Sequence, residues 1–313
     1  MGVGGLTAAG WRWSLRPRAL ATAGAVLIAA VGGLTLWGAT RGAAGASSTR
    51  TVTYCVEGGQ PLAMTVFAPS TVGSAHPAVL EVHGGGWQHG GRLLSLSQSG
   101  PATDLVGAGF VVASIDYGLA PEDPWPDQII DAKCAVRYLR AHAGDLGIDP
   151  NRIAALGTSA GGQLVSLLGT TGSSTLWNVG PYPDESSAVD AVVDQFGPAD
   201  LSATDWPPRS VVMIHRVFGV APGTTSPILT QASPITHVAA GDPPFLIVQG
   251  TDDQVVPMSQ SEHFAGQLRA DDVPVEVVLV DGGRHGLETP GENPSPPAIA
   301  ALITAYLVRT LHG

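Results

Sequence analysis

From residue 78 onward, short apolar stretches alternate with longer stretches in which apolar residues recur every three or four positions. Short stretches rich in β-branched residues predict buried strands, and the three-to-four spacing predicts helices. The predicted strands are residues 79–82, 110–115, 152–156, 191–195, 245–249 and 275–280. The predicted helices are residues 127–142, 161–168, 259–270 and 299–311. This alternation is typical of an α/β fold, with a mostly parallel sheet covered by crossover helices on both faces.

Two regions depart from the alternation. Residues 51–56 and 62–67 are β-rich and close together, so we expect them to form an antiparallel pair at the sheet edge. Residues 197–244 carry many prolines and no strong periodicity, which predicts an excursion over the catalytic face that forms a small cap rather than a second domain.

The first part of the chain has the pattern of a targeting segment. An uncharged run at residues 19–39 follows three arginines and leads into a stretch of small residues. The arginines are Arg12, Arg16 and Arg18. We therefore predict that residues 1–50 are an export signal or an N-terminal membrane anchor with a linker, and that residues 51–313 are the folded domain. Cleavage after Ala46 and retention as an anchor remain open, and both place the domain outside the cytoplasmic membrane.

Composition narrows the partners of the domain. The chain of 313 residues has 26 acidic against 15 basic residues and a net charge of −11, which disfavours binding to nucleic acid or to an anionic lipid surface. We expect membrane contact only through the N-terminal segment. The two cysteines exclude a disulfide-dense scaffold and a four-cysteine zinc site. Cys134 lies on the apolar stripe of a predicted helix, which favours a buried free thiol, while pairing with Cys55 stays open for an exported domain.

Residues 157–161 read Gly-Thr-Ser-Ala-Gly between a predicted strand and a predicted helix. In that context the GxSxG pattern predicts a sharp strand-to-helix turn that exposes the serine hydroxyl as a nucleophile. Side chains at positions 157 and 161 would collide with the neighbouring strand and helix, which explains the two glycines. Ser159 is the candidate nucleophile.

A second glycine-rich stretch, His-Gly-Gly-Gly-Trp at residues 83–87, follows the strand predicted at 79–82. Glycines there allow backbone N–H groups to approach a substrate closely. We expect the amides of Gly85, Gly86 and Ala160 to form an oxyanion hole, in which each donor contributes about 3 kcal/mol to the transition state. The role expected for His83 is to brace this loop.

A serine nucleophile on such a sheet needs an acid and a base later in the chain, each after a strand. Asp253 lies in a loop after the strand at 245–249, and His285 lies in a loop after the strand at 275–280. Because the carboxyl ends of parallel strands meet at one sheet edge, Ser159, Asp253 and His285 are expected to converge. Asp252 and Asp281 are rival acids, and we choose Asp253 over both.

These motifs, with DYGLAPEDPWP at 116–126, SPITHV at 233–238 and GTDDQVVP at 250–257, resemble the bacterial esterases related to the hormone-sensitive-lipase group. The resemblance covers roughly residues 78–286 and is strongest to carboxylesterases of acetyl and feruloyl esters. It implies the α/β-hydrolase fold, the same triad and the same oxyanion loop. Gly118 and Gln249 depart from the pattern, which commonly has Arg and His there, and neither is expected to touch the triad.

We therefore expect a serine hydrolase that cleaves short-acyl carboxylic esters, either small molecules or esters linked to polysaccharide, through an acyl-enzyme. No metal and no cofactor are expected, since the remaining histidines lack metal-ligand spacing. A serine peptidase of the prolyl-oligopeptidase type and a non-catalytic binding module are the alternatives. Turnover of a chromogenic acetate ester separates the enzyme from the binding module.

Overall fold

The computed structural model describes residues 46–57, 60–70, 75–93 and 101–312, all of which belong to the unit Gly42–Gly313. The predicted targeting run at 19–39 lies outside these residues. Strand β1 (Ala46–Glu57) pairs with β2 (Gln60–Pro69) from its first residue, so positions 46–50 belong to the sheet and not to a linker. Within the described ranges, no helix has the length and apolar character needed to cross a membrane.

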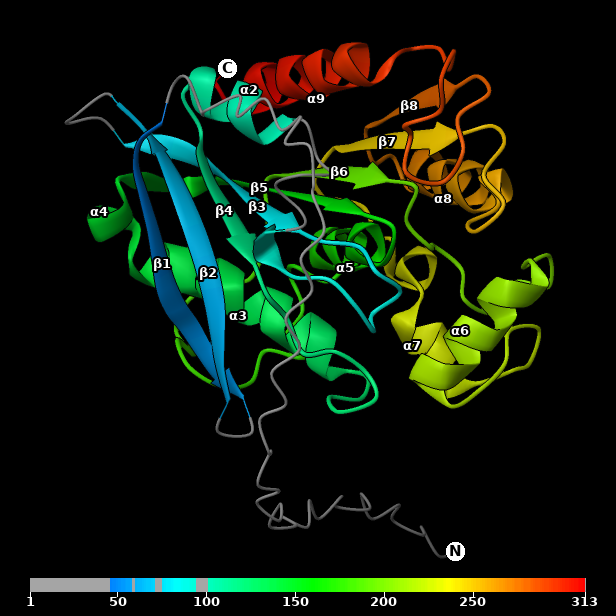
Figure 1. Cartoon of the computed structure of the whole chain (residues 1–313). Helices are drawn as coiled ribbons and strands as arrows, with labels where there is room; N and C mark the ends of the chain where they lie inside the picture. The colour runs from blue at the N-terminus through cyan, green and yellow to red at the C-terminus, as the bar shows by residue number, and fades with distance from the viewer. Residues whose placement is uncertain (1–45, 58–59, 71–74, 94–100, 313) are drawn as a thin grey trace, which may run out of the picture. The chain divides into compact units, whose positions relative to one another are not determined.

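The described residues contain one eight-stranded sheet in the order β1-β2-β4-β3-β5-β6-β7-β8 (Figure 1). The strands after β2 are β3 (His76–Val82), β4 (Val111–Ile115), β5 (Ile148–Thr158), β6 (Ala191–Gln195), β7 (Phe245–Gly250) and β8 (Val275–Val280). β1, β2 and β4 pair antiparallel, and every other pairing is parallel. The predicted mostly parallel sheet with an antiparallel edge is confirmed.

Helices cover both faces of the sheet (Figure 1). They are α2 (Pro101–Gly107), α3 (Asp127–Ala141), α4 (Ala143–Leu146), α5 (Ala160–Thr170), α8 (Met258–Ala270) and α9 (Pro296–Leu311). One buried cluster joins α3, α5 and α8 to the sheet through residues such as Ile129, Leu164 and Phe264. The other joins α2 and α9 to the opposite face through Leu105 and Ile303. Strands buried from both sides explain why their sequences are continuously apolar.

The proline-rich excursion at 197–244 holds regular helices. It contains α6 (Pro208–Phe218), α7 (Pro227–Ala232) and the 3₁₀ turn η1 (Pro234–His237). Pro208, Pro227 and Pro234 stand at the first turn of α6, α7 and η1, where a missing N–H costs nothing. Gly219 ends α6 in a left-handed conformation. These helices lie in the segment for which a small cap was predicted.

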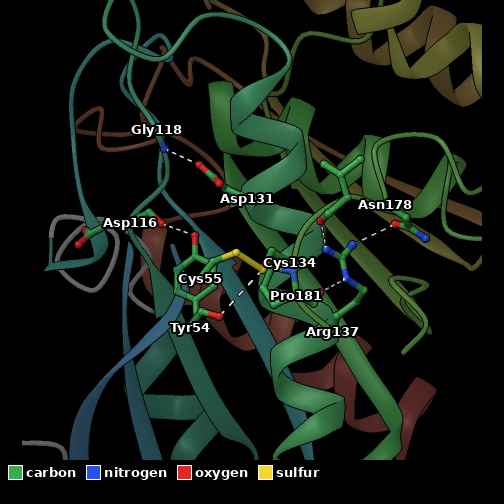
Figure 2. Close-up of a disulfide and its surroundings, with 10 residues drawn as sticks. Tyr54, Cys55, Asp116, Gly118, Asp131, Cys134, Arg137, Asn178 and Pro181 are labelled. Atoms are coloured by element: carbon green, nitrogen blue, oxygen red, sulfur yellow. Dashed lines mark hydrogen bonds between the residues drawn. A yellow bond between two sulfur atoms is a disulfide. The ribbon is translucent and has the colours of Figure 1, made fainter. Parts of the chain in front are cut away.

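Cys55 and Cys134 form a disulfide between β1 and α3 (Figure 2). The prediction of a free thiol at Cys134 is therefore wrong, and the alternative, pairing with Cys55, is correct. Cys134 is fully buried, as its place on the apolar stripe predicted. The partner strand β1 is not part of the helix pattern, and for that reason the stripe alone could not show the pairing. Next to the disulfide, the Tyr54 hydroxyl donates a hydrogen bond of 2.6 Å to the carbonyl of Asp116.

Candidate active site

Ser159 stands at the turn between β5 and α5 with φ 54° and ψ −119°. A positive φ is strained for a residue with a side chain, and such strain is typical of functional turns. The turn is held because the Ser159 amide donates to the Gln195 carbonyl on β6 at 2.9 Å. The side chain is half-buried and lines a cavity. This is the sharp strand-to-helix turn that the GxSxG pattern predicted.

The two flanking glycines are required by close approach. A Cβ added at Gly157 would lie 2.3 Å from the carbonyl oxygen of Gly161, and a Cβ at Gly161 would lie 2.1 Å from that of Val82. Contacts this short are not tolerated by rigid backbone atoms. The predicted steric reason for both glycines is therefore confirmed.

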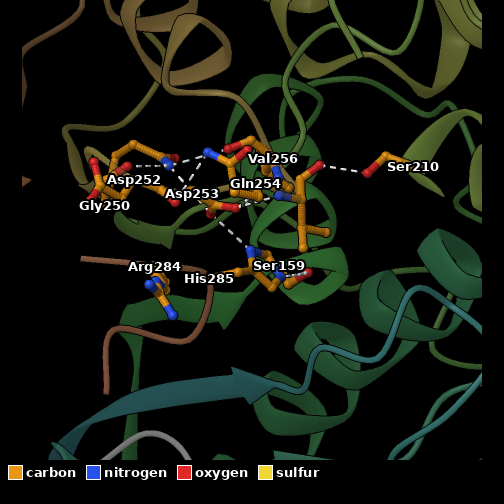
Figure 3. Close-up of polar contacts among 12 residues, drawn as sticks. Ser159, Ser210, Gly250, Asp252, Asp253, Gln254, Val256, Arg284 and His285 are labelled. Atoms are coloured by element: carbon orange, nitrogen blue, oxygen red, sulfur yellow. Dashed lines mark hydrogen bonds and ion pairs between the residues drawn. The ribbon is translucent and has the colours of Figure 1, made fainter. Parts of the chain in front are cut away.

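The structure brings the three predicted residues Ser159, His285 and Asp253 into one hydrogen-bonded row (Figure 3). His285 Nε2 lies 2.9 Å from Ser159 Oγ, and His285 Nδ1 lies 2.8 Å from Asp253 Oδ2. Phe196 packs edge-on against the imidazole, with ring centroids 4.9 Å apart. The ring is thus fixed between the two polar partners and an apolar neighbour.

The Asp253 carboxylate is buried and held by backbone amides. Its side chain is 0% exposed, against 24% for His285. Its Oδ1 accepts hydrogen bonds from the amides of Val255 and Val256 at 2.8 and 2.9 Å. These donors leave Oδ2 for the imidazole. The rival acids Asp252 and Asp281 are both exposed, and Figure 3 shows Asp252 away from the imidazole.

The expectation that Gln249 does not touch the triad is wrong. Gln249 Nε2 lies 3.4 Å from Asp253 Oδ2, and Gln249 is fully buried at the end of β7. The sequence predicts that Gln249 lies at a strand end beside Gly250, but the direction of its side-chain amide could not be predicted from it. Gly118, the other departure, donates its amide to Asp131 Oδ2 at 2.7 Å (Figure 2).

The glycine stretch is anchored by the two residues that flank it. His83 is buried, stacks on the Tyr117 ring at 4.2 Å and holds the Gly84 carbonyl at 2.6 Å through Nδ1. Burial lowers the pKa of His83, which favours a neutral ring. Trp87 is also buried and donates through Nε1 to Gln163 Oε1 on α5 at 3.0 Å. The bracing role expected for His83 agrees with these contacts.

Between these anchors the backbone faces the Ser159 cavity. Gly85 and Gly86 adopt φ of 117° and 61° and line a cavity of about 350 Å³ together with Ser159. Among the described residues, the amides of Gly85, Gly86 and Ala160 donate to no protein acceptor. Free amides beside a nucleophile are able to stabilise an anion formed there. His285 lines the same cavity, so the Ser159 side chain, the imidazole and the glycines Gly85 and Gly86 share one space.

Among the described residues, no three or more His, Cys, Asp or Glu side chains are grouped so that they could hold a metal ion.

Sequence comparison decides the family. The BD-FAE family model matches residues 64–268, which is more than half of the chain. The chain belongs to the BD-FAE family. The match runs from β2 to α8 and includes Ser159 and Asp253, while His285 lies beyond it.

Among curated proteins, this BD-FAE family member is similar to esterase LipC of Mycobacterium tuberculosis. The two are 34% identical over 216 residues, which is 68% of this chain and 53% of LipC. The chain spans about half the length of the curated relatives it matches.

Solved structures extend the likeness. A truncated carbohydrate esterase from gut microbiota superposes with a TM-score of 0.75 at 27% identity, over 86% of this chain and 98% of its own. The propionate-bound esterase Est2 of Thermogutta terrifontis gives a TM-score of 0.70 at 26% identity, over 86% and 95%. With the sheet order above, these likenesses confirm that this BD-FAE family member has the α/β-hydrolase fold.

Proposed function

We propose that this chain is a serine hydrolase that cleaves carboxylic esters, with Ser159 as nucleophile, His285 as general base and Asp253 as the orienting acid. The observation that carries the proposal is the hydrogen-bonded row from Ser159 Oγ through the imidazole to Asp253, at the wall of a cavity. The esterase relatives favour this reading over a peptidase. The intact row favours it over a non-catalytic binding module.

The geometry suits a two-step reaction. Ser159 Oγ attacks the ester carbonyl while its proton passes to His285 Nε2. The C–O bond to the alcohol then breaks, and the alcohol oxygen takes that proton from Nε2, which leaves an acyl group on Ser159. A water molecule that loses a proton to His285 Nε2 attacks this acyl group. The C–O bond to Ser159 then breaks, and Ser159 Oγ takes the proton back as the acid leaves. Asp253 stabilises the imidazolium in both steps.

The oxyanion of each tetrahedral intermediate needs donors that are already in place. We assign this role to the amides of Gly85, Gly86 and Ala160, which have no protein acceptor among the described residues. Backbone donors fixed by buried anchors need no reorganisation during the reaction. Removal of one comparable donor costs roughly 3 kcal/mol of transition-state stabilisation.

The substrate we propose is an ester with a short acyl group, either a small molecule or an ester linked to polysaccharide. A cavity of about 350 Å³ beside Ser159 supports a short acyl group. The carbohydrate esterase and the propionate-bound esterase to which the chain is similar support both substrate forms. Faster hydrolysis of p-nitrophenyl palmitate than of p-nitrophenyl acetate would contradict the short-acyl preference.

Paraoxon provides a direct test, because Thermogutta terrifontis esterase 2 is phosphorylated by it. The purified chain is treated with paraoxon and the modified peptide is identified by mass spectrometry. We expect one phosphoryl adduct on Ser159 together with loss of p-nitrophenyl acetate hydrolysis. Ser159→Ala should lose both, and Ser173→Ala, at an exposed serine, should lose neither. Activity retained by Ser159→Ala above a few per cent would show that another nucleophile acts.

We also propose that the domain acts outside the cytoplasmic membrane, either secreted or anchored by its N-terminal segment. The three arginines before the uncharged run at 19–39 support export. The Cys55–Cys134 disulfide supports it as well, since disulfides persist mainly in oxidising compartments. Protease treatment of intact producing cells should digest the domain, and protection of residues after Ser47 would contradict export.

A further inference from the structure

A second cavity of about 500 Å³ opens beside the first, at the N-terminal end of α6. Its apolar lining comes from Pro207, Pro208, Met213 and Val255, and Arg209 and Gln254 supply its polar rim. Met213 and Val255 also line the cavity of Ser159. The two cavities therefore share a wall, and we call them the first and the second compartment. The reaction at Ser159 does not by itself account for the second compartment.

Met213 separates the compartments at the oxyanion loop. Its Sδ lies so close to Gly86 that a Cβ added there would be 2.5 Å away from the sulfur. The thioether side chain is unbranched and half-buried, and methionine adapts its shape easily. An arm of a substrate bound at Ser159 can therefore pass along this side chain without a movement of the backbone.

Val255, the other shared residue, lies on the histidine side of the site. Its amide donates to Asp253 Oδ1 at 2.8 Å, and Asp253 in turn holds His285. The Ser210 hydroxyl on α6 donates to the Val255 carbonyl at 2.7 Å, and Figure 3 shows Ser210 directed at this loop. The helix that walls the second compartment is thus tied to the loop that carries the acid.

We propose that the second compartment binds the alcohol arm of the ester, as an apolar chain of four or more carbons. The proposal rests on the proposed ester hydrolysis. The leaving oxygen must receive its proton from His285 Nε2, so the alcohol arm begins at the imidazole and runs past Val255. The apolar lining favours methylene groups, each of which raises kcat/KM by up to about fourfold when fully buried. Met213 is then the residue that sets the preference for alcohol length.

The test compares kcat/KM for ethyl, butyl and hexyl acetate. Hydrolysis is measured as the acid released at constant pH. For the wild type we expect hexyl acetate to exceed ethyl acetate by at least about tenfold. Met213→Phe narrows the passage and should bring this ratio close to one. Val212→Phe is the control, because Val212 lies on the outward side of α6 with 52% exposure and should leave the ratio unchanged. The ratio cancels any general loss of catalysis.

Inhibition by 1-hexanol gives a second measurement that does not depend on the acyl step. It should compete with ethyl acetate in the wild type and in Val212→Phe, and much more weakly in folded Met213→Phe. The proposal fails if Met213→Phe keeps the wild-type ratio and the wild-type inhibition. It also fails if p-nitrophenyl hexanoate outpaces the acetate while the alkyl acetates do not differ, because the arm is then the acyl chain. Absence of hydrolysis of every ester by the folded wild type would instead overturn the proposed function.

Discussion

Gln249 Nε2 lies 3.4 Å from Asp253 Oδ2, the same oxygen that faces the imidazole of His285. The amide group also reaches the carbonyls of Gly250 and Val256 at 3.1 and 3.3 Å, and its Oε1 accepts from the Ser261 hydroxyl at 2.9 Å. One buried side chain therefore joins the end of β7, the acid loop and α8. It fixes the position of the Asp253 carboxylate beside the imidazole of His285.

Gln249→Leu removes these hydrogen bonds while roughly keeping the volume. We expect kcat for p-nitrophenyl acetate to fall about three- to tenfold and the free energy of unfolding to fall by about 1–3 kcal/mol, because the Ser261 hydroxyl loses its acceptor in the core. Steady-state kinetics and urea unfolding measure both effects. Gln267→Leu makes the same change at an exposed position of α8 and should alter neither. Unchanged kinetics in Gln249→Leu would show that Asp253 needs no such support.

Asp253→Asn should leave the protein folded and lower kcat by orders of magnitude, up to about 10⁴, since the amide favours the wrong tautomer of the histidine. Asp252→Asn and Asp281→Asn change exposed carboxylates and should remain within about threefold of the wild type. The three variants are assayed side by side, with circular dichroism as the check on folding. A collapse of kcat in either neighbour, with Asp253→Asn near the wild type, would move the role of the acid to that neighbour.

Burial raises the pKa of Asp194 on β6 to about 6, although its carboxylate accepts hydrogen bonds from the Ser166 hydroxyl and the Gly197 amide. A carboxyl whose pKa is raised on folding stabilises the native state when protonated, so its contribution is present below about pH 4 and is lost as the pH rises through about 6. Between pH 5 and pH 7.5 this amounts to about 1 kcal/mol. Asp194→Asn should remove that share of the pH dependence in urea unfolding. An identical pH dependence in variant and wild type would exclude Asp194 as its source.

The disulfide between Cys55 and Cys134 closes a loop with a sequence separation of 79. Its loss typically lowers the free energy of unfolding by about 2–5 kcal/mol. Replacing both cysteines by serine should therefore lower the unfolding midpoint, and a reducing agent should have the same effect on the wild type and none on the double variant. Equal midpoints for reduced wild type, oxidised wild type and double variant would mean that the bond contributes nothing to stability.

Much of the fold follows from local patterns. The strand at 191–195 and the strand at 275–280 have the predicted bounds, because each is rich in β-branched valines, which favour strands. The triad residues follow from the same logic, since parallel strands deliver their loops to one edge. The helices α6 and α7 were not among the predicted elements, because prolines at their first turns interrupt the local pattern.

Contacts between distant segments could not be predicted from the sequence. The partner of Cys134 lies 79 positions earlier, and nothing in the helical stripe points to it. Gln249 resembles any buried strand residue until the direction of its amide is known. Met213 stands on α6, and its contact with Gly86 depends on how the cap packs against the glycine loop. Such pairings are properties of the assembled sheet and cap.

The link between β1 and α3 also has a consequence for the order of biosynthesis. Cys55 leaves the ribosome 79 positions ahead of Cys134, and the chain has no other cysteine. Cys55 on β1 therefore stays a free thiol until α3 has been synthesised, and only then can β1 be fixed covalently. A nascent or truncated chain that stops before residue 134 carries an unpaired thiol, whereas the finished, oxidised chain carries none. A chaperone that reacts with free thiols can therefore bind the unfinished chain through Cys55 and not the finished, oxidised chain.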